Sequence, residues 1–573
     1  MKAAYWLLVV LIGYFILAPT VGVVLYGILP DPQNPSAGTE LATGTELVPG
    51  NEQVAGTELV PGTELVRMLR RSMPLLGNSL YIAVPVAFQA TVIGAAGAIA
   101  VKRLLFPGRR VLRFMYAVPL VSPPFVGSLS FIMLFGRRGL ITNGLLGLEV
   151  SPFGWQGIVV LQTISYGALA FLVITSGLER LDTTQESAAR TLGAGEWRVF
   201  FDVTLPFMLP ELSTAAVLVF LGSLADFGTP LIIGGAYRTL AADLYVQITG
   251  LYDMKSAAVS GLLLLAPSLA VFFLNRRAPL PGAFYVKGSQ TPDLVYASSD
   301  PWLAAGMVII AALYSLLVAV QAGFILLGAF AHNWRSDWTP TLAHFGTVVR
   351  GDLAPFANSV ALALIAATGA SLSGVLLAYL LRRGRLPLAK LVDLVTTLPA
   401  AVPGILFGIG YLVIFRYPLF GVGRLFMRGV DPPILLGTGS IIFILCVFRY
   451  MHVGLRSGSA LLEHIDPDLE DAARNLGQGD TGVWIDITMP LLAPALYAAF
   501  VKTFATTMTT LGAIIFLILP SNKVAVQQLF QIVTGSGVGA AAAMGVMLAA
   551  LTLAMLALFR GIAGVMTRRV SWQ

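Results

Sequence analysis

The chain carries little charge and almost no cysteine. Charged residues make up 11% of its 573 residues and hydrophobic residues 57%, whereas about a quarter of the residues in soluble proteins are charged. So few charges cannot cover the surface of a soluble protein of this length, which excludes that class. The single cysteine, Cys446, lies inside an apolar run and excludes an intramolecular disulfide framework.

Two kinds of site are also missing from the sequence. There is no Gly-x4-Gly-Lys-Ser/Thr phosphate loop, so the chain does not hydrolyse ATP by that route. We therefore expect no enzyme activity and no cofactor bound by this chain. The four histidines have no metal-ligand spacing, and we expect no metal site. The net charge of +7 comes from short basic clusters between apolar runs, which membrane topology explains without a nucleic-acid partner.

What the sequence does contain is a series of long apolar runs. A bilayer core of roughly 30 Å needs about 20 apolar residues per helix. On that measure the sequence predicts an all-α polytopic membrane protein with about twelve transmembrane helices. The predicted spans lie near residues 5–29, 78–101, 111–135, 155–176, 209–233, 256–275, 302–330, 358–381, 391–415, 434–456, 491–519 and 541–562.

The positions of Lys and Arg predict the orientation in the membrane. Cytoplasmic connections carry an excess of these residues, and with a cytoplasmic N-terminus most of them fall on that side. We therefore expect a multi-pass protein of the cell (inner or plasma) membrane with both termini in the cytoplasm. The first apolar run follows Lys2, as in a signal peptide, but it is too long for one, and we interpret it as a span.

Residues 30–77 form a long connection that this orientation places outside, as a periplasmic loop. Gly-Thr-Glu-Leu recurs within it, beginning at Gly38, Gly44, Gly56 and Gly62. Such an acidic, low-complexity run lacks the apolar face needed to fold alone. We interpret it as a tolerated loop expansion, and a binding role is the alternative.

Two similar stretches divide the chain into a tandem repeat. Residues 186–193 read Glu-Ser-Ala-Ala-Arg-Thr-Leu-Gly, and residues 470–477 read Glu-Asp-Ala-Ala-Arg-Asn-Leu-Gly, 284 positions later. Each glycine is followed thirteen residues later by a proline that opens an apolar run. This spacing predicts two pseudo-symmetric six-helix repeats, residues 1–285 and 286–573.

Paired prolines also recur, at an offset of 280 in the numbering. Pro119 and Pro123 lie in the third predicted span, and Pro399 and Pro403 lie in the ninth. Proline frees a backbone carbonyl and bends or breaks a helix, which lipid tolerates only where neighbours satisfy that carbonyl. We expect kinks or breaks at these positions, either as packing features or as part of a solute pathway.

The repeated stretch resembles the EAA loop of ABC importer permeases, the segment that docks on the ATP-hydrolysing subunit. The resemblance implies two copies of an ABC ATPase subunit on the cytoplasmic side, which use the ATP, and a solute-binding protein on the outer side. The motif's acidic position is Ser187 in one copy and Asp471 in the other, whereas its alanines and glycine are intact. The residues thereby implied in coupling are Glu186, Ser187, Ala188, Ala189, Gly193, Pro206, Asp471, Ala472, Ala473, Gly477 and Pro490.

Each of these loops reads as a short helix, a turn and a second short helix. Thr183 and Glu186 predict a capping box in the first copy, and in the second Asp466 is the expected cap and Pro467 the expected first helical residue. Gly193 and Gly477 can adopt the positive φ that ends a helix. The paired alanines allow a partner's backbone to approach, so the expected role is docking of a short helix in a partner's groove.

A polar group inside a span is a candidate functional residue. Asp226 lies in the fifth predicted span, and Thr510 holds the equivalent place in the second half. A carboxylate with hydroxyls suits a polar or cationic solute. Alternatively, Asp226 lies near the outer helix end and the threonines bond to their own helix. The candidates for the translocation path are Asp226, Thr229, Thr506, Thr509 and Thr510.

The segments around Asp226 and Thr510 are similar to fused permeases of the ferric-iron importer family, which implies ferric iron as the solute. Thiamine, polyamine and phosphonate permeases share the architecture and stay open as alternatives. A secondary transporter with two six-helix halves, or a channel, is an alternative of another class. Neither explains the duplicated cytoplasmic loops, and association with an ATPase distinguishes the first interpretation from both.

Overall fold

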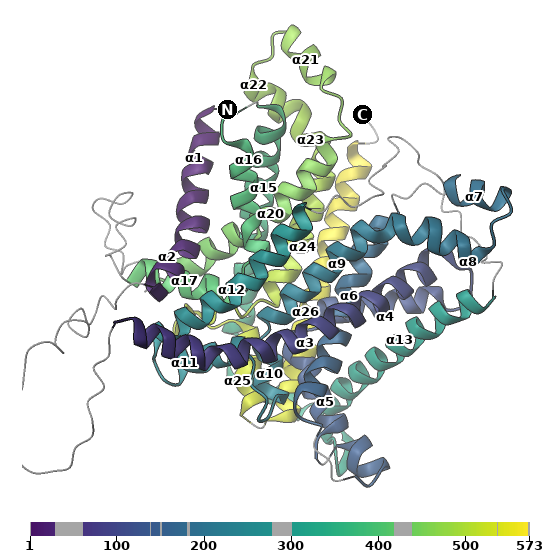
Figure 1. Cartoon of the computed structure of the whole chain (residues 1–573), viewed down its shortest axis with the longest axis vertical. Helices are drawn as coiled ribbons and strands as arrows, with labels where there is room; N and C mark the ends of the chain where they lie inside the picture. The colour runs from purple at the N-terminus through teal and green to yellow at the C-terminus, as the bar shows by residue number, and fades with distance from the viewer. Residues whose placement is uncertain are drawn as a thin grey trace, which may run out of the picture. The chain divides into compact units, whose positions relative to one another are not determined.

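The structure is a computed structural model that describes residues 2–28, 61–137, 139–148, 152–179, 184–277, 301–384, 386–416, 438–535 and 537–570 (Figure 1). The secondary structure of this part of the chain is helical apart from one antiparallel hairpin, which confirms the predicted all-α class. In the hairpin, β1 (Ala331–Asn333) pairs with β2 (Asp337–Pro340). Three of the four predicted Gly-Thr-Glu-Leu copies, those beginning at Gly38, Gly44 and Gly56, lie outside the described residues.

The chain packs into two compact units, and each takes segments from both halves of the sequence. Unit 1 consists of Met1–Gly77, Thr239–Pro267 and Ala357–Val524. Its described helices include the first part of α3 (Pro61–Arg103) and of α12 (Met254–Arg277), and nearly all of α15 (Ala354–Arg383). The others are α1 (Lys2–Ile12), η1 (Gly13–Leu17), α2 (Ala18–Ile28), α11 (Leu240–Thr249), α16 (Ala389–Thr397), η6 (Leu398–Ala400), α17 (Gly404–Arg416), α20 (Ser440–Leu462), α21 (Asp468–Asn475), α22 (Asp480–Gly482), η8 (Val483–Thr488), α23 (Met489–Leu491), α24 (Ala493–Met508) and η9 (Pro520–Asn522).

Unit 2 consists of Asn78–Arg238, Ser268–Phe356 and Ala525–Gln573. Besides the rest of α3 and α12 and the hairpin, its described helices are α4 (Arg109–Val121), α5 (Pro124–Phe135), η4 (Leu140–Leu145), α6 (Trp155–Leu178), α7 (Thr184–Thr191), α8 (Glu196–Arg198), η5 (Val199–Thr204), α9 (Leu205–Ala225), α10 (Gly228–Ile233), α13 (Pro301–Phe330), α14 (Ala343–Gly351), α25 (Ala525–Thr534) and α26 (Val538–Val570).

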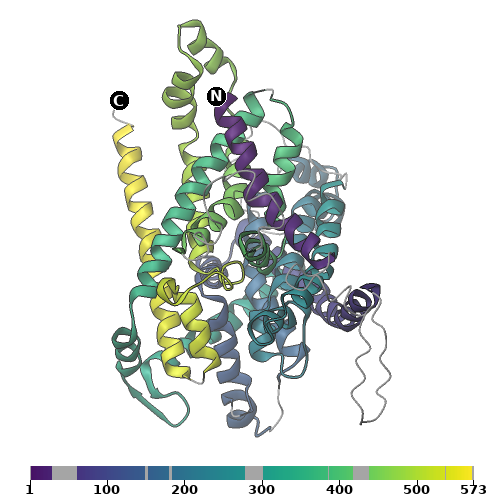
Figure 2. The same cartoon turned by 90° about the vertical axis from the view of Figure 1, so that its left-hand side faces the viewer.

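The exchange of segments is visible in the helix contacts within each unit. In unit 1 the N-terminal helices α1 and α2 pack on α16 and α17 from the second half of the chain. In unit 2 the helix α13, which begins the second half, packs on α4 and α5, and the yellow helices α25 and α26 of Figure 2 also contact α5. The compact units therefore divide the chain differently from the predicted repeats at 1–285 and 286–573. The predicted repeats describe duplicated sequence, whereas the units describe which segments pack together.

The number of membrane spans agrees with the sequence. In the described part of the chain ten helices are long and apolar enough to cross a membrane, and two bent pairs bring the total to as many as twelve. One pair joins Ala389–Ala400 to Gly404–Phe415 with a bend of 110°, and the other joins Asp480–Leu491 to Ala493–Met508 with a bend of 67°. These bends mean that some spans are not the straight helices that a hydropathy run suggests.

Five predicted segments, four spans and one loop, need correction. The span predicted at 111–135 is two helices, α4 and α5, and the span at 391–415 is divided between α16 and α17; both divisions occur at the second proline of a pair. The span at 209–233 contains a break between α9 and α10, and that at 491–519 stops being helical after Met508. The loop predicted at 30–77 is too long, because α3 begins at Pro61.

Glycines permit the closest helix contacts in both units. On α3, a Cβ added at Gly94 would lie 2.6 Å from the backbone nitrogen of Phe171 in α6. On α15, a Cβ added at Gly374 would lie 2.4 Å from the backbone oxygen of Met451 in α20. Small residues at such contacts let helix backbones pack tightly in lipid. The two glycines have the same offset in the numbering as the paired prolines, so the repeat extends to its helix packing.

Candidate functional site

The first repeated loop is held to unit 2 by a buried carboxylate. Glu186 lies in the first turn of α7 and is 6% exposed. Its Oε2 accepts a hydrogen bond of 3.2 Å from Nη1 of Arg103, at the end of α3, and its Oε1 accepts one of 3.0 Å from the hydroxyl of Thr204 in η5. A single side chain therefore ties together the short helix, the end of a membrane helix and the start of the next one.

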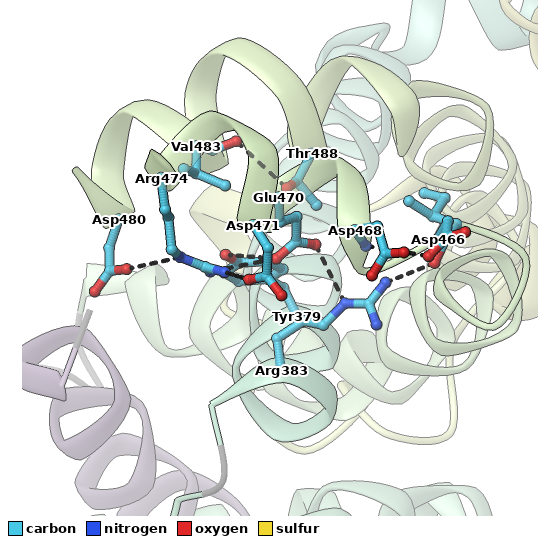
Figure 3. A network of polar contacts seen from close by, with 11 residues as sticks. Tyr379, Arg383, Asp466, Asp468, Glu470, Asp471, Arg474, Asp480, Val483 and Thr488 are labelled. Carbon is cyan, nitrogen blue, oxygen red and sulfur yellow. Dashed lines mark hydrogen bonds and ion pairs between the residues drawn. The ribbon is translucent and has the colours of Figure 1, made fainter. Parts of the chain in front are cut away.

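The second loop repeats this arrangement in unit 1 (Figure 3). Glu470 is 2% exposed and accepts hydrogen bonds from Nε of Arg383 at 3.2 Å, from the hydroxyl of Tyr379 at 3.4 Å and from Nη2 of Arg474 at 3.4 Å. The other end of the Arg383 guanidinium donates to the carbonyl of Ile465 at 2.7 Å. Arg383 closes α15 as Arg103 closes α3, and this pair again has the offset of the paired prolines.

Of these four anchors, the sequence alone singled out only Glu186, as a coupling residue. Arg103 and Arg383 counted only among the basic residues that predict the orientation, and Glu470 was not among the candidates. The signal was nevertheless present, because the two glutamates repeat at the offset of the loops and the two arginines at the offset of the paired prolines. A basic residue in the last turn of a membrane helix, repeated together with an acid in the loop, indicates an ion pair rather than topology alone.

Both short helices end at glycines with the backbone conformation expected from the sequence. Gly193 has φ of +85° and Gly477 has φ of +91°. The amide of Ala194 donates to the carbonyl of Ala189 at 3.0 Å, and that of Gln478 donates to Ala473 at 3.1 Å. These bonds close the C-terminal end of each helix. A Cβ added at either glycine would meet no atom within 4 Å, so only the backbone angle requires glycine here.

The structure separates the motif residues into an inner and an outer set. Ser187 and Asp471, which stand at the motif's acidic position, are exposed, whereas the preceding glutamates are buried. The first alanine of each pair is exposed, while Ala189 is half-buried and Ala473 is 6% exposed. The outer set is therefore Ser187, Ala188, Leu192 and Gly193 in one copy and Asp471, Ala472, Leu476 and Gly477 in the other.

The predicted caps differ slightly from the observed ones. The carboxylate of Asp466 accepts a hydrogen bond of 3.1 Å from the amide of Asp468, and α21 begins at Asp468, with Pro467 as its N-cap. The predicted first helical residue was Pro467, so the helix starts one residue later. Thr183, the predicted cap of the first loop, lies outside the described residues.

The two loops lead differently into the next membrane helix. From Glu196 to Ala225 the first copy is helical without a break through α8, η5 and α9, and Pro206 lies in the first turn of α9. In the second copy α23 ends at Leu491, one residue after Pro490, and α24 starts at Ala493 after the 67° bend. Both prolines thus lie near the start of a membrane helix, as the sequence predicts.

Asp226 lies at the break between α9 and α10 in unit 2. Its Oδ1 accepts hydrogen bonds from the amides of Gly228 and Thr229 at 3.0 and 3.1 Å, and its Oδ2 accepts one from Nε2 of Gln162 at 2.9 Å. The carboxylate thus caps the short helix α10. Thr229 is 8% exposed and lies in the first turn of α10.

The threonines of unit 1 lie at the end of α24. Thr506 and Thr509 donate to carbonyls of their own helix, at 2.8 Å to Lys502 and at 3.2 Å to Thr506. Thr510 differs, because its hydroxyl lies 2.7 Å from the hydroxyl of Tyr450 in α20. Among the residues that the structure describes, no group of three or more His, Cys, Asp or Glu side chains is placed to hold a metal ion.

Comparison with known proteins gives consistent matches. Residues 90–278 match the family described as binding-protein-dependent transport system inner membrane component. The chain is 30% identical to a ferric transport system permease protein of Actinobacillus pleuropneumoniae over 507 residues, which is 86% of this chain and 71% of that protein.

Two further relatives match shorter parts. A molybdenum transport system permease protein of Escherichia coli is 39% identical over 153 residues, 26% of this chain and 66% of that protein. A thiamine transport system permease protein of Escherichia coli is 30% identical over 220 residues, 36% of this chain and 41% of that protein.

Proposed function

Because the chain belongs to the inner-membrane permease family of binding-protein-dependent transport systems, we propose that its two anchored loops each dock one copy of a separate ATPase subunit. The chain itself is the multi-pass permease subunit of an ABC importer. The proposed partner hydrolyses the ATP on the cytoplasmic side, where we also place both termini, and a solute-binding protein delivers the solute from outside. Because the chain belongs to this family, the secondary-transporter and channel alternatives no longer apply.

The observation that supports docking is the two-sided character of each short helix. One side is fixed by a buried carboxylate, while the other carries an exposed leucine beside small residues. Leu192 is 89% exposed and Leu476 is 88% exposed. An apolar side chain this exposed at the tip of a helix is typical of a surface that a partner covers.

The anchors also suggest how motion is transmitted. When a partner moves α7, Glu186 carries that movement to Arg103 on α3 and to Thr204 at the start of the helix that continues as α9. Charge-assisted hydrogen bonds are about twice as strong as neutral ones and direct the contact. The same path runs from Glu470 to α15 through Arg383. We propose that these bonds convert a movement of the ATPase into a movement of membrane helices.

For the solute we propose ferric iron. The ferric relative aligns with 86% of this chain, whereas the molybdenum and thiamine relatives align with 26% and 36%. Thiamine, polyamine and phosphonate remain the alternatives for the same machinery. We propose that Asp226, Thr229, Thr506, Thr509 and Thr510 lie along the path of the solute.

Co-purification tests the docking proposal. We expect the pair Leu192→Asp and Leu476→Asp to abolish association with the ATPase subunit, because each places a charge where an apolar contact is needed. Leu342→Asp is the matched control, since Leu342 is 68% exposed but precedes α14, far along the chain from both loops. Equal recovery of the ATPase with the double variant and the control would refute the proposed docking surface.

ATP hydrolysis by the reconstituted complex tests the solute. We expect stimulation by an iron-loaded binding protein and none by the empty protein. Stimulation by a thiamine-loaded or polyamine-loaded protein instead would keep the transport mechanism and replace the solute.

A further inference from the structure

A cavity adjoins the first loop in unit 2. Its walls are the end of α3, the short helices α7 and α8, the helix η5 and the beginning of α13. The cavity is half-open and has a volume of about 70 Å³, more than twice the roughly 30 Å³ that a water molecule occupies in the liquid. It therefore has room for a group larger than one water.

One wall of the cavity carries a hydrogen-bond donor that the described residues leave unused. Arg103 lines the cavity, its side chain is 12% exposed, and its Nη1 donates to Glu186. Its Nη2 is buried and has no hydrogen-bond partner among the described residues. A buried donor without an acceptor is costly, so an acceptor that reaches Nη2 from the cavity is favoured.

The charges around the cavity are balanced. Two arginines and two glutamates line it in two ion pairs, Arg103 with Glu186 at 3.2 Å and Arg190 with Glu196 at 2.8 Å. A ligand with a net charge would bring an unpaired charge into this partly buried place, which is unfavourable. The cavity therefore suits a neutral ligand whose acceptor is an uncharged oxygen or nitrogen.

The remaining walls are apolar and suit a ring. Phe200 lies on η5, and Leu303 and Met307 lie in the first two turns of α13. Phenylalanine packs well on other aromatic rings, and the sulfur of methionine makes favourable contacts with them. These side chains favour an aromatic body for the ligand.

The second repeat shows which group fits beside such a carboxylate. Tyr379 of unit 1 corresponds to Ile99 by the offset of the paired prolines, and its hydroxyl donates to Glu470 at 3.4 Å (Figure 3). Trp484 corresponds to Phe200 by the offset of the loops, and its ring packs on that of Tyr379 at 4.8 Å. The chain thus places a phenol next to the buried carboxylate in one copy, where the other copy has Ile99 and a cavity.

We propose that this cavity binds a small neutral compound with a phenolic hydroxyl. A hydroxyl both donates and accepts, so it can donate to Glu186 and accept from Nη2 of Arg103, while the ring contacts Phe200. A phenol is neutral at physiological pH, like the tyrosine side chain with its pKa of about 10. Because the cavity is half-open, a ring larger than its volume can enter with the hydroxyl first.

The inference goes beyond the proposed transport function, and the binding itself does not depend on that function. A bound phenol connects α7 to α3, since its hydroxyl contacts Glu186 on one helix and Arg103 on the other. Tyr379 makes the same kind of connection between α15 and α21 within unit 1. Regulation of transport through a stiffer first loop is a further consequence, which rests on the proposed docking of the ATPase at this loop.

Fluorine NMR of the full-length chain in lipid nanodiscs tests the site, with 4-fluorophenol as the probe. We expect saturable binding to the wild type. Ile99→Tyr should abolish it, because this variant introduces the side chain of the second copy and fills the cavity. 4-Fluorotoluene, which has a methyl group in place of the hydroxyl, should bind about tenfold more weakly than 4-fluorophenol, because it leaves Nη2 of Arg103 without an acceptor.

The matched control is Ile309→Tyr, the same substitution at an exposed position of α13 in the same unit, which should leave binding unchanged. Phe200→Trp introduces the other ring of the second copy and decides the test if Ile99→Tyr does not fold. Absence of saturable binding would overturn the inference. So would equal binding to the wild type and a folded filling variant, or equal binding of 4-fluorotoluene.

Hydrogen exchange measures the effect on the loop. Saturating 4-fluorophenol should slow exchange of the α7 amides, residues 184–191, severalfold in the wild type, because a bound ligand adds to the free energy that holds the segment. Exchange of α21, residues 468–475, should not change, since Tyr379 already occupies the corresponding place. Binding without slower exchange of α7 would overturn the connection between α7 and α3. Failure of an ATPase subunit to co-purify would refute the proposed function and leave the binding result intact.

Discussion

Glu470→Gln should release the second loop from its membrane helix. The buried carboxylate compensates Arg383, whose side chain is 18% exposed, and a neutral amide leaves that guanidinium without its counter-ion. Removing one partner of a buried pair costs about 3–5 kcal/mol. Glutamine keeps the shape and some hydrogen bonding, so we take the lower end, about 3 kcal/mol, which corresponds to roughly a hundredfold in an opening equilibrium.

Hydrogen exchange of the α21 amides in the purified complex measures this opening directly. We expect exchange in residues 468–475 to accelerate roughly a hundredfold, because local opening follows the free energy that holds the segment. Asp471→Asn is the matched control: it removes the same charge one residue later. The side chain of Asp471 is 65% exposed and its ion pair with Arg474 is 2.7 Å long, so solvent screening limits the loss to under about 1 kcal/mol, less than tenfold. Equal acceleration in the two variants would show that burial of Glu470 does not anchor the loop.

Three further perturbations follow from the same structure. Gly477→Val should lower ATPase stimulation by the loaded binding protein severalfold, because φ of +91° costs a β-branched residue at least about 1–2 kcal/mol. Gly477→Asn should retain the stimulation. A similar loss in both variants would mean that contact with the partner, and not the backbone angle, requires glycine. Asp226→Ala should lower the stability of α10 by about 1–2 kcal/mol, because the amides of Gly228 and Thr229 lose their acceptor. Asp226→Asn should lower it much less, since asparagine can still accept from these amides. Equal melting temperatures of the two variants would contradict the capping role. Hydrogen bonds from the hydroxyl and amide of Thr339 hold the pKa of Asp337 below its usual range. These bonds stabilise the hairpin at neutral pH and are lost as the pH falls through that lowered pKa. Thr339→Val should raise the pKa of Asp337 measured by carboxyl NMR.

The sequence predicted features that a short pattern determines. Gly193 and Gly477 end their helices with positive φ because a loop that must reverse directly after a helix favours a residue without a Cβ. The number of spans follows from hydropathy, because lipid requires every backbone group to be satisfied within a helix. Paired prolines located the breaks between α4 and α5 and between α16 and α17, although the length of each break was not predictable.

What the sequence did not predict depends on contacts between distant segments. The break at Asp226 does not begin at a proline, and the carboxylate at the break accepts a hydrogen bond from Gln162 on another helix. Glu186 and Arg103 are 83 residues apart, so their ion pair emerges only when α3 and α7 are packed. Arg449 lies in a run that hydropathy indicates as an ordinary span, and only the structure shows that its buried Nε and Nη1 have no hydrogen-bond partner among the described residues.

The two copies of the loop use the same anchor with different surroundings. In unit 1 the rings of Tyr379 and Trp484 pack at 4.8 Å beside Glu470. The residues that correspond to them in unit 2, by the offsets of the paired prolines and of the loops, are Ile99 and Phe200, and these line a cavity together with Glu186. A filled contact resists relative movement better than one with a void, because a void removes dispersion contacts on one side. If the loops transmit motion as proposed, we expect the bend after Leu491 to weaken direct transmission along the second copy's helix. We then expect the second copy to act mainly through its ring contact with α15, and the first copy to act along the unbroken helix from Glu196 to Ala225.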